Sequence, residues 1–253
     1  MQRLESKFYY ASLNDVVQKV NKRLTKYLED QNEENIHDIR TSIRKLEAAW
    51  YVLPKKTRQK PTVRKFVKLH KKLFKDNSKV RDYDIILQRL EPLANNEKIK
   101  RLIYKKRKQQ MIVALKHAKD IKHVDFPQIS QNEISTTKLE KRFRKTSIKL
   151  IDGIQTLLPV VLSSEDKIEQ LHQLRKDCKK LRYILELAPD SESSSFVEKL
   201  KQMQDLLGTI HDSDITIDFL KGISSKIDTK DMVEKELEVR SNKYKELVQT
   251  QVL

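Results

Sequence analysis

The sequence predicts an all-α protein, and three observations lead to this prediction. Only three glycines and six prolines occur among 253 residues, a composition that favours long helices over sheets with tight turns. Apolar residues recur at helical spacing along most of the chain. One order of helices and motifs also occurs twice, which predicts two pseudo-symmetric helical bundles formed by an internal duplication.

In the first half, the periodicity predicts two amphipathic helices, a basic connector between prolines, a third helix, a fourth segment and a longer helix. These elements are expected, in order, at Leu13–Leu28, Ile36–Leu53, Pro54–Pro61, Val63–Ser78, from about Asp82, and at Glu97–Lys119. The stretch from Ile121 to Thr137 contains Pro127 and scattered polar residues. We therefore expect an irregular connection there, and the boundary between the halves.

The second half repeats this plan and ends with an additional helix after Asp228. Its other helices are expected at Lys138–Leu158, Glu165–Ala188, Phe196–Leu207 and Asp212–Leu220. An acidic, serine-rich turn from Pro189 to Ser195 takes the place of the proline-bounded connector. We predict one domain over residues 1–253, with one half at about 1–125 and the other at about 136–253.

The repeat itself is visible in two pairs of matching segments. A histidine helix carries His37, Arg40, Arg44, Lys45 and Leu46 in the first half and His172, Arg175, Lys179, Lys180 and Leu181 in the second. Further along, Val80–Ile85 corresponds to Ile210–Ile215, so that Asp82 matches Asp212 and Asp84 matches Asp214. Asp82 and Asp212 are expected to cap helices that begin there. Two matched segments in each half indicate duplication.

The charge of the chain predicts its partner. Fifty-three Lys and Arg face thirty-six Asp and Glu, which leaves a formal charge of +17 and predicts a polyanionic ligand. The single cysteine, Cys178, excludes an intramolecular disulfide and a Cys-pair zinc site, as in a reducing compartment. The longest apolar run, Ala48–Leu53, is too short to cross a bilayer. We expect a cytoplasmic protein that does not bind membranes.

Each histidine helix places its cations on one side and its apolar residues on the other. In the first helix the cationic side contains His37, Arg40 and Arg44, and in the second His172, Arg175 and Lys179. Like charges at this spacing are unfavourable without a ligand, and Arg and Lys both bind phosphate oxygens well. Further rows contain Arg23 and Lys26, and Arg142, Lys145 and Lys149. Solvated surface explains any single row, and the repetition favours a binding face.

These motifs resemble the CHAD family, the conserved histidine α-helical domain. The resemblance rests on His37-Asp38-Ile39-Arg40 and His172-Gln173-Leu174-Arg175, together with the second pair of matching segments. It implies that the basic faces of two bundles meet in a central cleft or pore that binds inorganic polyphosphate. The contacts implied at matching positions are His37, Arg40, Arg44, Lys45, Lys71, His172, Arg175, Lys179, Lys180, Arg182, Tyr183, Lys201 and Gln204.

Four positions depart from the family pattern. Glu47 stands where the second half has Arg182, and Asn77 and Ser78 stand where it has Leu207 and Gly208. His211 replaces the more usual asparagine before Asp212. Because the first three lie in the first half, we expect that half to hold phosphate less tightly, and we assign no phosphate contact to His211.

The sequence predicts binding without catalysis. It shows no nucleophile with a base, no metal cluster and no glycine-rich phosphate loop, so we expect no enzyme activity, no metal and no cofactor. The alternative ligand is nucleic acid, bound weakly through the same basic surface, although aromatics make up only 6% and are not interleaved with the basic rows. A scaffold for an acidic protein is a third hypothesis. Polyphosphate binding would also allow association with polyphosphate granules.

Overall fold

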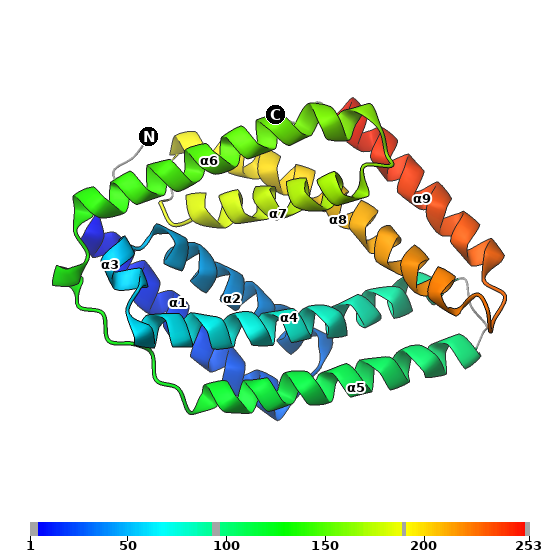
Figure 1. The fold of residues 1–253 in the computed structure, drawn as a ribbon, viewed down its shortest axis with the longest axis horizontal. Helices are drawn as coiled ribbons and strands as arrows, with labels where there is room; N and C mark the ends of the chain where they lie inside the picture. Colours follow the sequence, from blue (N-terminus) through cyan, green and yellow to red (C-terminus); the bar gives the residue numbers. More distant parts are fainter. Residues whose placement is uncertain (1–4, 93–96, 189–190, 251–253) are drawn as a thin grey trace. The chain divides into compact units, whose positions relative to one another are not determined.

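The computed structural model describes residues 5–92, 97–188 and 191–250, and within them the elements are helices (Figure 1). They are, in order, α1 Ser6–Glu29, α2 Glu33–Val52, α3 Lys55–Arg58, α4 Pro61–Leu90, α5 Glu97–Lys122, the short 3₁₀ helix η1 Gln131–Glu133, α6 Thr136–Ser163, α7 Ile168–Leu185, α8 Ser191–Ile223 and α9 Lys230–Gln249. The predicted all-α class is confirmed. None of the helices in these ranges has the length and apolarity that a membrane span requires.

Local sequence signals explain several helix starts. The side chain of Asn32 accepts a hydrogen bond from the backbone N–H of Asn35 at 2.8 Å and so caps α2, whose first turn is acidic. The proline that was expected to end the basic connector, Pro61, is the first residue of α4, where a missing N–H costs nothing. These two signals fix where the histidine helix and its neighbour begin.

Two predicted helix breaks are wrong. α4 continues through Asn77, Ser78 and Asp82, and α8 continues through Leu207, Gly208 and Asp212. The polar residues of α4 have hydrogen-bond partners inside the fold. Tyr27 of α1 donates to Asn77 Oδ1 at 2.8 Å, and Ser78 donates to Phe74 O of its own helix at 2.8 Å. Asp82 and Asp212 therefore lie inside helices and do not cap them.

Two further boundaries differ from the prediction. α6 was expected to end at Leu158 but passes through Pro159 to Ser163. Pro159 and Gln155 are both exposed, so water can satisfy the carbonyl that the proline leaves without a donor. The turn expected from Pro189 to Ser195 is shorter than predicted, because α8 begins at Ser191. Residues 189–190 of this turn lie outside the described part of the chain.

The chain forms two compact units. Unit 1 comprises Met1–Arg81, Gln109–Lys149 and Tyr183–Ser194, and unit 2 comprises Asp82–Lys108, Leu150–Arg182 and Ser195–Leu253, as far as these residues are described. Each unit draws on both predicted halves. The halves remain a prediction, because compactness does not report on duplication.

An aromatic cluster holds the irregular connection of unit 1 against its helices. Trp50 on α2 stacks with Phe66 on α4, with ring centroids 6.1 Å apart, and Phe126 meets the Phe66 ring edge-on at 5.4 Å. Tyr9 on α1 is fully buried and donates to Ala49 O at 2.5 Å, and burial raises its pKa. The aromatic pairs of this cluster stabilise the fold beyond what the burial of their apolar area contributes. The connection is thus irregular in backbone but anchored by its side chains.

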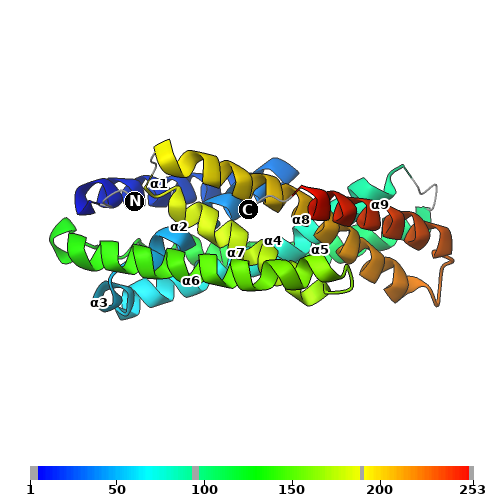
Figure 2. The same ribbon diagram turned by 90° about the horizontal axis from the view of Figure 1, so that it is seen from above.

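Unit 2 has an aliphatic core to which four helices contribute. Its buried members are Ile86, Leu90, Ile99, Ile103, Leu220 and Ile223, and Met232 and Val233 of α9 pack against them. Figures 1 and 2 show α8 and α9 as antiparallel neighbours. Arg89 reinforces this core with hydrogen bonds to Glu236 at 2.7 Å and to Ser213 at 2.8 Å. α9 is therefore an integral part of unit 2.

Candidate functional site

The residues predicted for the site are divided between the two units. Unit 1 contains His37, Arg40, Arg44, Lys45, Lys71 and Tyr183, and also Arg23, Lys26, Arg142, Lys145 and Lys149. Unit 2 contains His172, Arg175, Lys179, Lys180, Arg182, Lys201 and Gln204. Each unit thus has a group of candidate cations of its own, and the predicted central cleft remains a prediction.

A cavity of about 270 Å³ in unit 1 brings three predicted residues together. Arg23 comes from α1, Lys45 from α2 and Tyr183 from the end of α7. The full lining is Ser12, Asp15, Val16, Lys19, Arg23, Ser42, Lys45, Tyr183, Glu186 and Leu187. The cavity therefore combines cations, hydroxyl groups and two carboxylates in one concave surface.

The cations of this cavity differ in how firmly they are held. Arg23 Nη1 donates to Ser42 Oγ at 2.7 Å and its Nε lies 3.2 Å from Asp38 Oδ2, which fixes the guanidinium. Lys19 pairs with Asp15 at 2.7 Å. Lys45 is exposed and has no ionic partner among the described residues. An incoming anion would therefore meet one mobile cation, Lys45, and two cations that already have partners, Lys19 and Arg23.

The two arginines of the first histidine helix share one aromatic ring. The guanidinium carbons of Arg40 and Arg44 lie 4.9 and 5.0 Å from the centre of the Phe74 ring, and Arg40 also donates to Ser78 Oγ at 2.6 Å. Cation–π contacts partly offset the repulsion between neighbouring cations. Ser78, one of the departures from the family pattern, is thus an anchor for Arg40.

Other candidates of unit 1 are exposed or occupied. The side chain of His37 is 69% exposed, and Lys26, Lys145 and Lys149 are also exposed. Lys71 lies 3.8 Å from Glu47 and 5.4 Å from the centre of the Tyr51 ring, so the departure at Glu47 supplies a competing anion. Arg142 donates to Tyr51 O at 3.0 Å and so ties α6 to the end of α2.

Lys201 and Gln204, the two candidates on α8, have different surroundings. Lys201 is 53% exposed and lies 3.7 Å from Glu198 one turn earlier. Gln204 is buried and donates to Cys178 O at 3.2 Å, which packs α8 against α7. Burial raises the pKa of the Cys178 thiol to about 12, so this cysteine is a core residue.

The second histidine helix meets a paired histidine in unit 2. Nε2 of His172 lies 2.7 Å from Nδ1 of His211 on α8, and the two rings are nearly perpendicular at 87°. The same His172 nitrogen lies 3.4 Å from Asp214 Oδ2. Asp214 in turn accepts a hydrogen bond from Arg240 Nε at 2.6 Å. His211, which the sequence marked only as a departure, is therefore a direct neighbour of the predicted ligand His172.

Burial and charge determine the protonation of this group. Burial lowers the pKa of His211 to about 3, and the positive charge of Arg175 acts in the same direction. Burial opposes ionisation of Asp214, but the nearby His172 and the hydrogen bond from Arg240 outweigh it, so the pKa of Asp214 is lowered. Near neutral pH, His211 is neutral and Asp214 is a carboxylate.

A buried Asp–Arg pair occurs in both repeats. Asp84 contacts Arg107 at 2.5 Å and Asp214 contacts Arg240 at 2.6 Å, and both pairs belong to unit 2. The sequence placed the two aspartates at corresponding positions but missed both arginines. They follow their aspartates by 23 and 26 residues, so no constant spacing within a helix could reveal them.

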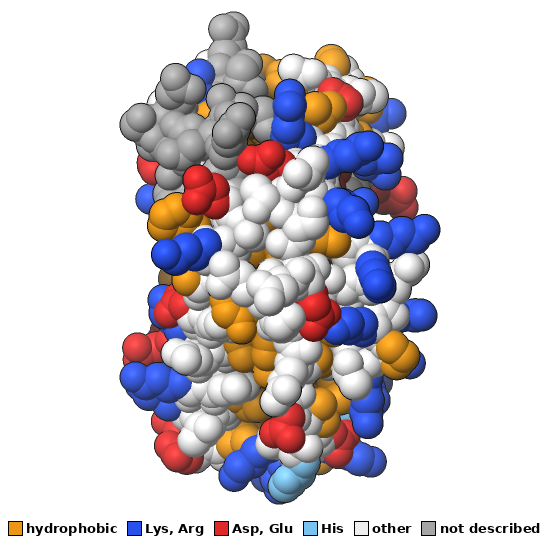
Figure 3. All heavy atoms as spheres, turned by 90° about the vertical axis from the view of Figure 1, so that its left-hand side faces the viewer, with side chains coloured by type: hydrophobic (Ala, Val, Ile, Leu, Met, Phe, Trp, Pro, Cys, Tyr) orange, Lys and Arg blue, Asp and Glu red, His pale blue; other side chains and the backbone are white. Residues whose placement is uncertain are grey.

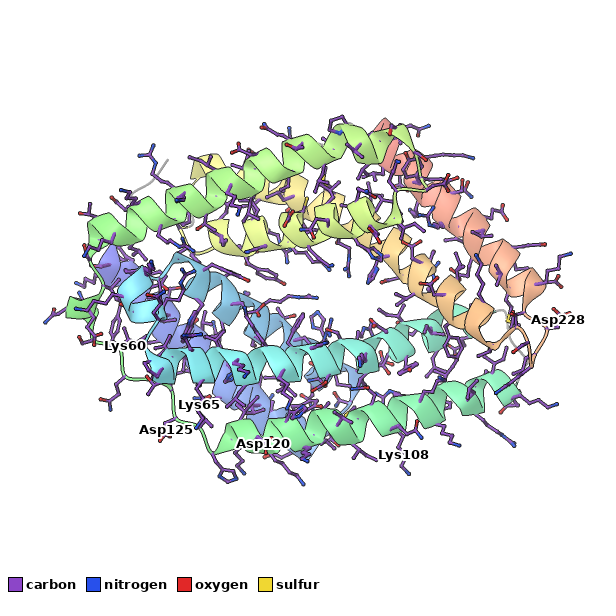
Figure 4. The ribbon with its side chains drawn as sticks, in the orientation of Figure 1. Lys60, Lys65, Lys108, Asp120, Asp125 and Asp228 are labelled. Atoms are coloured by element: carbon purple, nitrogen blue, oxygen red, sulfur yellow. The ribbon has the colours of Figure 1, made fainter. Side chains whose placement is uncertain are left out.

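Surface cations outside these groups are numerous. Figure 3 shows Lys and Arg side chains gathered along one edge of the face it presents. On α5, Lys108 points outward to solvent (Figure 4), whereas its neighbour Arg107 is paired with the buried Asp84. Position on a helix alone therefore does not distinguish a structural cation from a free one.

Comparisons with known proteins agree with the fold. A family model described as CHAD domain matches residues 11–221. The CHAD domain from the plant Ricinus communis, a solved crystal structure, is similar with a TM-score of 0.59 and 14% sequence identity, over 98% of this chain and 88% of that chain. At this identity the likeness shows a shared fold. No curated protein matches the chain.

Proposed function

Because the chain belongs to the CHAD family, we propose that it binds inorganic polyphosphate, without hydrolysing it, through the cations of its two units. The family resemblance suggests the ligand, and the net charge of +17 supplies the attraction. The proposal includes a cytoplasmic location and association with polyphosphate granules.

The cavity of unit 1 is the observation that carries this proposal. It joins Arg23, Lys45 and Tyr183, which come from three helices and are up to 160 residues apart in the sequence. A fixed guanidinium, a mobile ammonium and nearby hydroxyl groups suit the oxygens of a phosphate chain. Each charge-assisted hydrogen bond contributes about 1.5–3 kcal/mol, so a few such contacts would hold one segment of the polymer.

The carboxylates of Asp15 and Glu186 also line this cavity and limit how much negative charge it accepts. A polymer would therefore gain much of its affinity from contacts repeated along its length, including those to Arg175 and Lys179. Repeated modest contacts give strong binding without a single dominant site. Binding releases counterions, so affinity should fall steeply with salt.

A competition experiment tests the proposal. Long-chain polyphosphate and DNA or RNA are compared at matched phosphate concentration, with hydrolysis of the polyphosphate measured in the same samples. We expect polyphosphate to displace nucleic acid and to remain intact. Preference for nucleic acid, or hydrolysis that disappears with the variants below, would overturn the proposal.

Matched variants locate the binding face. Lys45→Ala removes the mobile cation of the cavity, and Lys108→Ala removes an exposed lysine of α5 that has no ionic partner among the described residues. Both change the net charge by one. We expect Lys45→Ala to weaken polyphosphate binding several times more than Lys108→Ala. Equal effects would indicate that only the total charge matters.

A further inference from the structure

We infer that Arg240 on α9 is a positioning residue for the phosphate-binding face of α7, acting on His172 through Asp214. This inference rests on the proposed function, because it assigns a partner to a residue of that same face. It also extends the functional part of the chain, since α9 lies outside residues 11–221, the span that the family model matches.

Arg240 is fixed by three contacts. Its side chain is 7% exposed; Nε donates to Asp214 Oδ1 at 2.6 Å and Nη2 donates to the backbone carbonyl of Glu165 at 2.8 Å. Nη1 lies 3.5 Å from Glu165 Oε2. The planar guanidinium thus joins α8 to the segment that precedes α7, and it cannot move without breaking several contacts.

Asp214 passes this constraint on to His172. One carboxylate oxygen binds Arg240, and the other is buried without a hydrogen-bond partner and lies 3.4 Å from His172 Nε2. The negative charge of this oxygen favours a proton on Nε2 of His172, which then donates to Nδ1 of His211. This tautomer leaves Nδ1 of His172 as the nitrogen available to other partners, a ligand included.

Arg240 also balances the charge of Asp214. The charged or titratable groups that act on this carboxylate are His172 on α7 and Arg240 on α9. Arg175 and Lys179 on α7 act on the neighbouring His211, and Glu165 before α7 faces Arg240. Without Arg240, the negative charge of Asp214 would neutralise a cation of the α7 face. With Arg240 present, Asp214 orients His172 while the face keeps its positive charge for an anion.

The chain provides its own control in the pair formed by Asp84 and Arg107. Asp84 is buried like Asp214, and the pair belongs to unit 2. In the described structure, however, no contact joins Arg107 to Asp214 or His172. Arg240→Met and Arg107→Met therefore remove the same kind of ion pair. Only the first should affect His172.

The test combines nitrogen and proton NMR of the histidine rings with polyphosphate binding and thermal unfolding. In Arg240→Met we expect His172 to take up its second proton at higher pH, because Asp214 has lost its compensating cation. Polyphosphate affinity should fall by about threefold to tenfold, the size of one ordinary hydrogen bond. Arg240→Lys should restore part of both properties, and Arg107→Met should lower Tm but leave the His172 signals in place.

Asp214→Asn is a second variant that does not depend on the folding of Arg240→Met. It keeps the shape of the side chain and removes the charge, so His172 should protonate at lower pH, opposite to the effect of Arg240→Met. Unchanged His172 titration in both variants would show that Arg240 is only a structural tie and would overturn the inference. If the unaltered protein fails to bind polyphosphate, the proposed function fails, while the NMR measurement still decides the inference.

Discussion

The two buried Asp–Arg pairs are alike in geometry but differ in what lies beside them. In the second repeat, the free oxygen of Asp214 faces His172, and His211 completes a group that titrates. Arg81 occupies the position of His211 in the first repeat and lies 3.1 Å from Glu33. One repeat thus has a permanent cation where the other has a neutral imidazole. The two matching segments thus share a buried Asp–Arg pair and differ in the group beside it.

The partners of the cations differ in the same way. In the first histidine helix, Arg40 is hydrogen-bonded to Ser78, and both Arg40 and Arg44 lie on Phe74. Ser78 corresponds to Gly208, which has no side chain and has open space around it. The departures from the family pattern therefore add protein partners to the cations of the first repeat. Such partners position a cation but also compete with a ligand.

The largest expected effect is the loss of stability when either aspartate is removed. Asp214→Ala leaves Arg240 buried and unpaired at 7% exposure, and we expect a loss of about 3–5 kcal/mol. Asp84→Ala leaves Arg107, which is 23% exposed, so water can solvate it and the loss should be smaller. Urea unfolding with unchanged m values would measure both. An equal loss at the two sites would contradict this difference.

The next effect is destabilisation by acid. Burial lowers the pKa of His70 to about 4 and that of His211 to about 3, so the fold favours their neutral forms. This stabilisation is complete above the unfolded pKa of about 6.5 and is lost as the pH falls toward these values. Each of the two histidines lowers the free energy of unfolding by up to about 1.4 kcal/mol for each pH unit of acidification in this range.

His211→Asn separates the two contributions. It keeps a polar side chain and removes one of the two titrating groups. We expect the free energy of unfolding to fall less between pH 6 and pH 4 than in the unaltered protein. Urea unfolding at several pH values would measure it. His37→Asn, which replaces a histidine whose side chain is 69% exposed, is the matched control.

A smaller effect is expected on binding when the shared ring of the first histidine helix is changed. Phe74→Leu keeps an apolar side chain but removes the cation–π contacts of Arg40 and Arg44, each worth about 0.5–2 kcal/mol. Polyphosphate affinity should fall by a few fold at low salt. Circular dichroism controls for helicity. Unchanged affinity would show that these arginines do not need the ring to bind.

The smallest expected effect is a gain. Glu47→Gln removes the carboxylate 3.8 Å from Lys71 and leaves that lysine available for an anion. Because the pair is half exposed, the gain should be below about 1 kcal/mol, or a few fold in affinity. Titration with polyphosphate would measure it, and a loss of affinity would contradict the view that Glu47 competes with the ligand.

The sequence by itself determined the helical class, most helix positions, the repeated histidine motif and the net charge. These properties depend on residue type and on spacing within a few turns. It also placed Asp84 and Asp214 at equivalent positions. It was wrong where polar residues suggested a break, because whether Asn77 ends a helix depends on the hydroxyl of Tyr27, fifty residues earlier.

Only the tertiary structure decided which cations are held and by what. The partners of Asp84 and Asp214 lie on other helices, 23 and 26 residues away, and Arg23 reaches the cavity beside Tyr183 only after folding. Helical periodicity shows which side of a helix is buried, but not which side chain of another helix packs there. Contacts between distant helices therefore separate the fixed cations, such as Arg240, from the mobile ones, such as Lys45.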